Sequence, residues 1–283
     1  MACNRLQEPP MHLLGLKNLR WAAVSNNPFI THYIQQRNNN NSNNEPALSV
    51  LQNAADLDNE DWPVLGQGAG GVTRKATYDG KDVAVKTYAG ELTSDGSPLD
   101  EKIISRTAFH VCQQHPCLIQ LLGETNNGAL VMEFLDGYTA LAGPPSMQTC
   151  SRDVYDASTK LTTAQVRTLL VGLSQVLEKL HANGICHGDF YAHNILIRLS
   201  ADGIDVKLSD FGAAFFYDAA SQYGSLVQRC EVRAFGVLIE EVVALASDGA
   251  SPTLDKLKAV AATAAGTDAF TFAQIRASIE ERA

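Results

Sequence analysis

The sequence lacks the features that assign a protein to a membrane or to a secreted disulfide scaffold. It has no apolar run of about 18 residues, the length of a membrane span. The first thirty residues contain no basic stretch followed by an apolar one, so no signal peptide is predicted. The six cysteines are scattered and never follow a CxxC spacing, which favours a reduced, cytoplasmic setting.

Positive charge is also scarce. The chain carries 22 Lys and Arg against 31 Asp and Glu, a net charge of -9. This balance disfavours nucleic acid or an anionic membrane surface as a partner, although a few local cations suffice for a small phosphorylated ligand. With 45% hydrophobic residues in 283, the chain can bury a sizeable core, and we expect one large globular domain or two small ones.

The first 36 residues differ from the rest. Their apolar spacing follows the L-x-x-L-x-L-x-x-N-x-L pattern of a leucine-rich repeat at Leu19, Ala22, Val24, Asn27 and Phe29. The triplets "NRL" and "NPF" also stand 23 residues apart, at 4–6 and 27–29. The alternative is an amphipathic segment with a chance Asn. We predict a leucine-rich-repeat remnant over 1–36; a lone repeat cannot bury its own face, so it is either a capping remnant or the end of an upstream array.

A polar tract separates this segment from the main domain. The stretch "QQRNNNNSNNE" at 35–45 has no core-forming capacity, and residues 37–60 are assigned to an Asn-rich linker. From residue 61 onward, strand patterns come first and helical patterns follow, which is an α+β order. "YDGKDVAVK" predicts a hairpin, 100–114 a helix, and 232–246 a mostly apolar, hence buried, helix.

A Gly-rich stretch follows the first predicted strand. Gly66, Gly68 and Gly71 form G-x-G-x-x-G, in which small residues let backbone N–H groups approach phosphate oxygens. The motif alone is weak, but a dinucleotide-binding site would continue into a helix. Here a second strand follows and leads to "VAVK" with Lys86. A buried Lys needs an anionic partner, so the stretch predicts a flap over a nucleotide phosphate.

A carboxylate on the next helix is a second candidate partner for Lys86. No Asp or Glu lies between Glu101 and Glu124, so this helix offers only Asp100 or Glu101. We choose Glu101. Its alternative role is at the helix N-terminus, where the helix dipole favours a carboxylate.

Two polar stretches flank a predicted hairpin. "HGDFYAHN" contains Asp189 and Asn194, and "LSDFGAA" contains Asp210. The hairpin between them, with Asp202-Gly203 in its turn, should bring Asn194 and Asp210 side by side. Amide and carboxylate oxygens suit Mg²⁺, and Asp189 could accept a proton from an attacking hydroxyl.

Taken together, the Gly-rich stretch, "VAVK", "HGDFYAHN" and "DFG" match the protein-kinase signature set in order and approximate spacing. The sequence therefore resembles protein kinases over residues 62–246. The resemblance implies a bilobal fold, with a β-rich small lobe at 61–135 and a mainly helical, trimmed large lobe at 136–283. It further implies ATP and Mg²⁺ as cofactors and "EFL", from Glu133 to Leu135, as the hinge that binds adenine behind Met132.

The resemblance also implies roles for single residues. The three glycines would cover the phosphates, and Lys86 would contact the α- and β-phosphates while pairing with Glu101. Asp189 would be the catalytic base or would orient the hydroxyl. Asn194 and Asp210 would hold Mg²⁺.

Four departures from the pattern affect the functional reading. Gly188 replaces the Arg that usually pairs with a phosphorylated activation loop, and Tyr191 replaces a Lys near the γ-phosphate. The segment after "DFG" is short and lacks "APE", with only 20 residues between Asp210 and Glu231, where the buried helix is expected to begin. The region after 246 is brief.

These departures leave three functions open. The chain is predicted to phosphorylate a protein hydroxyl, in the manner of a leucine-rich-repeat-associated kinase with a possible protein partner at the repeat segment. "HGD" and the short segment also look like small-molecule kinases of the aminoglycoside and choline phosphotransferase type. The third reading is a pseudokinase that binds nucleotide without turnover.

Overall fold

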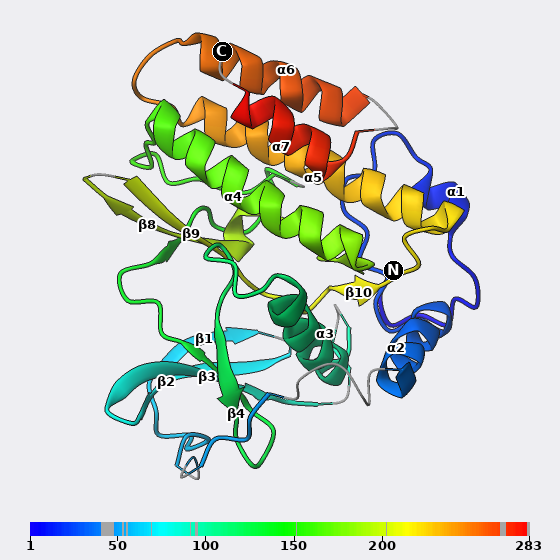
Figure 1. The fold of residues 1–283 in the computed structure, drawn as a ribbon, viewed down its shortest axis with the longest axis vertical. Coiled ribbons are helices and arrows are strands. Elements are labelled where there is room, and N and C mark those ends of the chain that lie inside the picture. Colours follow the sequence, from blue (N-terminus) through cyan, green and yellow to red (C-terminus); the bar gives the residue numbers. More distant parts are fainter. Residues whose placement is uncertain are drawn as a thin grey trace.

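The computed structural model describes residues 1–40, 48–52, 54, 56–68, 70–90, 92–93, 96–150, 152–201, 203–266 and 270–281, with only the backbone at 36–40. Residues 41–47 of the predicted linker at 37–60, and Asp202 of the predicted hairpin turn, lie outside the described residues. The chain forms a β-rich lobe and a mainly helical lobe, joined near the middle of the molecule (Figure 1). The predicted α+β class is confirmed.

The small lobe is one antiparallel sheet with a helix beside it. Five strands pair in the order β1-β2-β3-β5-β4. Their bounds are Val64–Gly68, Gly71–Tyr78, Lys81–Tyr88, Leu121–Glu124 and Leu130–Glu133 for β1 to β5. The predicted hairpin is confirmed: Asp79 and Gly80 have φ of 47° and 74°, as its tight turn requires. Helix α3, Pro98–Val111, follows β3 and carries its acidic residues in its first turn.

The described part of the large lobe contains four α-helices, of which α4 and α5 are the longest. Helix α4, Thr163–Ala182, begins with a capping box between Thr162 and Gln165. Helices α5, α6 and α7 span Gln222–Ala244, Pro252–Gly266 and Phe272–Glu280. The predicted hairpin is β8, Ile195–Ser200, with β9, Gly203–Leu208. Three two-residue strands complete the lobe: β6 at Thr139–Ala140, β7 at Ile185–Cys186 and β10 at Phe215–Phe216.

Helix α5 begins earlier than its apolar run indicates. The predicted start near 231–232 is wrong, because the helix starts at Gln222, about two and a half turns earlier. The Ser221 side chain caps it by accepting the Gly224 N–H at 2.9 Å. Polar residues in the first turns hide this start from a search for apolar periodicity. The connection from Asp210 to the helix is therefore only residues 211–221.

The N-terminal segment, residues 1–34, lies along the large lobe. It contains α1, Met11–Leu14, and the start of α2, Pro28–Asn40, and α1 lies beside α5 while α2 lies near β10 (Figure 1). Its buried apolar side chains form one cluster with those of β10 and α5, consisting of Leu14, Ala22, Val24, Phe29, Ile30, Cys186, Phe215, Tyr217, Tyr223, Val227 and Cys230. The segment therefore shares a core with the kinase-like part of the chain. Helix α2 runs on into the polar tract.

Within this segment, Asn27 is fully buried and holds three backbone groups. Its Oδ1 accepts the Leu6 N–H at 3.1 Å, and its Nδ2 donates to Met1 O at 2.9 Å and Val24 O at 2.8 Å. These bonds close residues 1–27 into a compact loop. None of the described helices is both long enough and apolar enough to cross a membrane.

Candidate active site

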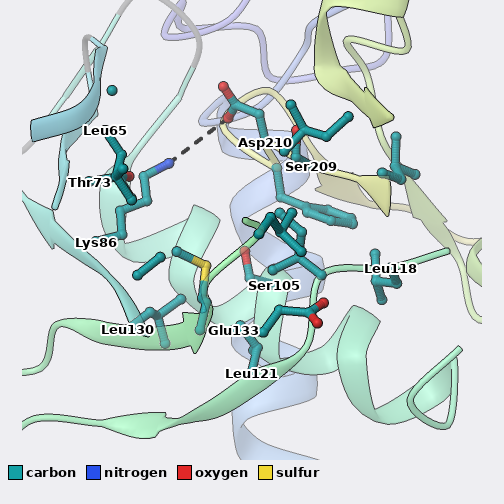
Figure 2. Close-up of a pocket in the computed structure, with 18 of the residues that line it drawn as sticks. Leu65, Thr73, Lys86, Ser105, Leu118, Leu121, Leu130, Glu133, Ser209 and Asp210 are labelled. Carbon is teal, nitrogen blue, oxygen red and sulfur yellow. Dashed lines mark ion pairs between the residues drawn. The ribbon is translucent and has the colours of Figure 1, made fainter. Parts of the chain in front are cut away.

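A cavity of about 430 Å³ opens between the lobes. Figure 2 shows Leu65 and Thr73 on the same side as Lys86, Leu118 on the opposite side, and Lys86 pointing towards Asp210. Its lining is mostly apolar, with Lys86, Glu101 and Asp210 gathered at one end. This is the layout of a pocket for a flat apolar ring that carries an anionic tail.

Lys86 lies at the charged end, where β3 and α3 face each other. Its Nζ forms a close ion pair with Glu101 Oε1 and lies 4.0 Å from Asp210 Oδ1. Glu101 is 5% exposed, so its charge is compensated by Lys86 rather than by water. Asp100 does not join this pair, and burial raises the pKa of its carboxyl to about 6.

The β1–β2 turn covers a second hollow of about 340 Å³, bordered by Lys86 and Asp210. A Cβ added at Gly66 or Gly68 would meet no atom within 4 Å, so these two glycines leave free space under the turn. A Cβ at Gly71 would lie 2.0 Å from Thr87 O. Gly71 is therefore needed by the sheet itself, whereas Gly66 and Gly68 keep room for a ligand.

Asn194 links Asp189 to the residue that precedes Asp210. Its Nδ2 donates to both Asp189 O and Asp189 Oδ2 at 2.9 Å, and its backbone oxygen accepts the Ser209 N–H at 2.9 Å. The hairpin thus places Asn194 next to the residue that precedes Asp210. Since both amide hydrogens are used, the Asn194 Oδ1 atom remains as a ligand.

The donor set fits a nucleotide-bound Mg²⁺. Asp210 has φ of 57°, accepts the Gly212 N–H on Oδ1 at 3.0 Å and has a side chain 56% exposed to the cleft. Within the described residues, no group of three or more His, Cys, Asp or Glu side chains could hold a metal alone. Mg²⁺ is commonly held by one or two protein oxygens together with phosphates, which is what Asn194 and Asp210 can offer.

Asp189 is suited to accept a proton. Its side chain is 41% exposed. Burial raises the pKa of its carboxyl above the ordinary value, although the charge of His187 and the Asn194 amide act in the opposite direction. A raised pKa makes the carboxylate a stronger base at the position where a hydroxyl would approach.

Glu231 of α5 holds the backbone of the loop that carries Asp189, a role that the sequence reasoning missed. It is 3% exposed, accepts the Gly188 N–H at 2.9 Å and the His187 N–H at 3.3 Å, and lies 2.7 Å from His181 Nε2. Burial alone would raise the pKa of Glu231, but His181, His187 and the Gly188 N–H outweigh it, so its pKa is lowered. The available signal was a carboxylate within an otherwise apolar helical run.

Gly188 itself is held in a conformation that other residues rarely adopt. Its φ is 77°, and a Cβ there would lie 2.4 Å from Ala213 O. The glycine in "HGD" is therefore required by the close approach of the segment after "DFG".

His193 is held against the Asp153 carboxylate. Its N–H and Nδ1 both contact the Asp153 carboxylate at 2.9 Å, and its Nε2 lies 3.8 Å from Asp189 Oδ2. Burial alone would lower the pKa of His193, but the hydrogen bond and charge of Asp153 raise it above the ordinary value. Asp153 comes from a distant loop, and no sequence pattern pointed to it.

The hinge residues are placed along the cavity. Leu135 lines it, and so does Glu133, but the Glu133 carboxylate pairs with Lys207 at 2.5 Å and accepts the Gln120 N–H at 2.9 Å. The Glu133 side chain is thus tied to the β9 strand, and its backbone N–H donates to Gln120 O at 3.0 Å, so neither group faces a ligand.

A nucleotide-sized cleft between a Gly-rich sheet and a helical lobe defines a phosphotransferase-like architecture. Comparison with known proteins makes the class specific. Residues 60–243 match the family model "Protein kinase domain". This span covers more than half of the chain, and the chain belongs to the protein kinase family.

Curated relatives agree with this assignment. The chain is 32% identical to serine/threonine-protein kinase dst4 of Dictyostelium discoideum over 156 residues, which are 53% of this chain and 29% of that protein. It is 26% identical to human mitogen-activated protein kinase kinase kinase 7 over 202 residues, covering 64% and 30%. It is 28% identical to a probable LRR receptor-like serine/threonine-protein kinase of Arabidopsis thaliana over 208 residues, covering 63% and 18%. The chain thus spans less than a third of each relative's length.

Proposed function

We propose that this chain is an active protein kinase that transfers the γ-phosphate of Mg-ATP to a serine or threonine hydroxyl of a protein. The observation that carries the proposal is that Lys86 and Asp210 border the hollow under the Gly-rich turn, while Asn194 bonds both Asp189 and Ser209, the residue before Asp210. The names of the relatives support a serine or threonine acceptor.

The residues divide the work as follows. Lys86, fixed by Glu101, holds phosphate oxygens, and the backbone of the Gly-rich turn covers them. Asn194 and Asp210 would hold Mg²⁺, which neutralises the charge on the phosphates. Asp189, oriented by the Asn194 amide, takes the proton of the acceptor hydroxyl as its oxygen bonds to the γ-phosphorus and the bridging P–O bond breaks.

Incubation with γ-labelled Mg-ATP tests the proposal. We expect label on the chain or on a casein-type protein, and no label from the Asp189→Asn variant. Label only on an aminoglycoside or choline would instead support a small-molecule kinase, a function that the protein-kinase relatives do not favour. Nucleotide binding without transfer to anything would support a pseudokinase.

We also propose that residues 1–36 derive from a leucine-rich repeat and contribute to binding a protein partner. The support is the repeat spacing, the buried Asn27 that satisfies backbone groups, and one relative described as LRR receptor-like. Because Val24 and Phe29 already pack against the large lobe, a partner would meet the opposite, exposed side of the segment. Further 23-residue repeats in the reading frame upstream of Met1 would support the end of an array, and their absence would leave only the capping remnant.

A cytoplasmic location is proposed as well. All six cysteines are free thiols, three of them buried, which suits a reducing compartment. A fluorescent fusion that fills the cytoplasm would agree, and one confined to a secretory organelle would not.

A further inference from the structure

The N-terminal segment reaches the catalytic loop through one side chain. The Trp21 ring stacks on Tyr191 with centroids 4.2 Å apart and planes 6° from parallel. The Trp21 Nε1–H also donates to Phe190 O at 2.8 Å. Two different contacts therefore join one residue to the two positions that follow Asp189.

Trp21 is itself held in place from the large lobe. Arg233 of α5 is 3% exposed, and its Nη1 donates to Leu16 O at 3.1 Å and to Leu19 O at 3.4 Å. On the other side of Trp21, Ala22 and Val24 are buried in the cluster with α5 and β10. The backbone on both sides of Trp21 is thus fixed to the large lobe. The indole can therefore restrain the catalytic loop instead of moving with it.

The catalytic loop has two other supports, one at each end. Glu231 holds Gly188 and His187 before Asp189. Asp153 holds His193 after it. The middle of the loop, Phe190 and Tyr191, contacts Trp21, and Tyr191 stands where the family usually has a Lys. The stack thus engages the side chain that stands in place of that Lys.

We propose that Trp21 is a positioning residue of the active site: it fixes the Phe190–Tyr191 part of the loop so that Asp189 faces the acceptor hydroxyl. The N-terminal segment is then part of the catalytic unit. This inference rests on the proposed kinase function. Misplacing a reacting group by about 1 Å can lower a rate by up to ~100-fold, so the loss of Trp21 should act on kcat.

Steady-state kinetics with a protein acceptor test this, alongside the dissociation constant of a non-hydrolysable ATP analogue. Trp21→Ala should lower kcat about tenfold or more and change nucleotide binding by less than about twofold, since Trp21 does not line the nucleotide cavity. Trp21→Phe keeps a stacked ring without the N–H donor and should lie between wild type and Trp21→Ala. It also serves as the folded variant if Trp21→Ala fails to fold.

The chain offers a matched control, because Trp62 is its other tryptophan. Trp62 Nε1 also donates to a backbone oxygen, that of Asp56 at 2.8 Å, but in the small lobe. Even if Trp62→Ala lowers the melting temperature as much as Trp21→Ala does, it should lower kcat by less than about twofold. In a double-mutant cycle, Tyr191→Ala should cost little further kcat once Trp21→Ala is present.

Hydrogen exchange separates this inference from the proposed function. Trp21→Ala should speed amide exchange at 189–194 and leave the β8–β9 hairpin unchanged, whether or not the chain transfers phosphate. A wild-type chain without transfer activity would defeat the proposed function. Unchanged exchange and unchanged kcat in Trp21→Ala, or equal kcat losses in the Trp21 and Trp62 variants, would overturn the inference.

Discussion

The Glu231 carboxylate lies directly beneath the backbone of Gly188 and accepts its N–H at 2.9 Å. With the His187 N–H and the His181 ring, it ties the catalytic loop to α5 through a buried negative charge. A buried charge that loses its partners is strongly unfavourable, so this contact governs both the stability of the large lobe and the placement of Asp189.

Glu231→Gln should lower the free energy of unfolding by about 3 kcal/mol at neutral pH, because the charged member of a buried network is removed. The pKa of Glu231 is lowered in the folded state, so its stabilisation is full above its ordinary value of 4.5 and is lost as pH falls through the folded value. Urea unfolding at several pH values measures this. The acid-side slope should be shallower in the variant.

Glu240→Gln on the same helix is the control, since this side chain is 50% exposed and pairs only with Arg152. It should change stability by less than about 1 kcal/mol. Equal effects of the two substitutions would show that the buried network has no special role.

Lys86→Met and Asp210→Ala should each abolish phosphate transfer, with a loss of at least ~100-fold, because each removes a charge that faces the phosphates. Asp210→Ala should also weaken Mg²⁺-dependent nucleotide binding. Labelled phosphate transfer and calorimetric nucleotide titration measure the two effects. Lys81→Met, on the same strand but exposed, should leave both unchanged. Full activity in either site variant would remove the proposed mechanism.

Gly71→Ala should destabilise the small lobe by about 2 kcal/mol, since the new methyl would lie 2.0 Å from Thr87 O. Gly68→Ala meets no atom within 4 Å and should change stability by less than about 0.5 kcal/mol. Its methyl would instead enter the phosphate hollow and raise the KM for ATP. Thermal melting and initial rates separate the two outcomes. A reversal of the stability order would disprove the assignment of Gly71 to the sheet and Gly68 to the ligand.

The chain should be active without phosphorylation of the 211–221 connection. Gly188 has no side chain to pair with a phosphate. The connection is also short, because α5 begins directly after its cap residue Ser221. Phosphatase treatment, checked by mass spectrometry, should leave the initial rate unchanged. A large loss of rate after treatment would mean that another cation reads a phosphate there.

The local parts of the site could be predicted from the sequence. The Asp79-Gly80 turn and the β8–β9 hairpin follow from turn residues between strand patterns, and the hairpin necessarily brings its two ends together. The choice of Glu101 over Asp100 as the neighbour of Lys86 agrees with the burial of Glu101 in the structure. These elements are specified by residues close to one another in the chain.

The supports of the catalytic loop could not be predicted in this way. Trp21 contacts Phe190 across 169 positions, and Asp153 contacts His193 across 40. Such contacts depend on how whole elements pack, which leaves no periodic trace in a single sequence. The start of α5 was missed for a related reason: its first turns are stabilised by the Ser221 cap and by packing against the N-terminal segment rather than by an apolar stripe of their own.

The close approach of Ala213 O to Gly188 also bears on how this chain can evolve. A single nucleotide change converts several glycine codons into arginine codons, so the family's usual residue is within mutational reach. The arginine, however, would place its Cβ 2.4 Å from Ala213 O and would have to adopt the φ of 77° that residue 188 holds here. Reversion to arginine at this one position is therefore sterically blocked unless the Ala213 backbone moves as well.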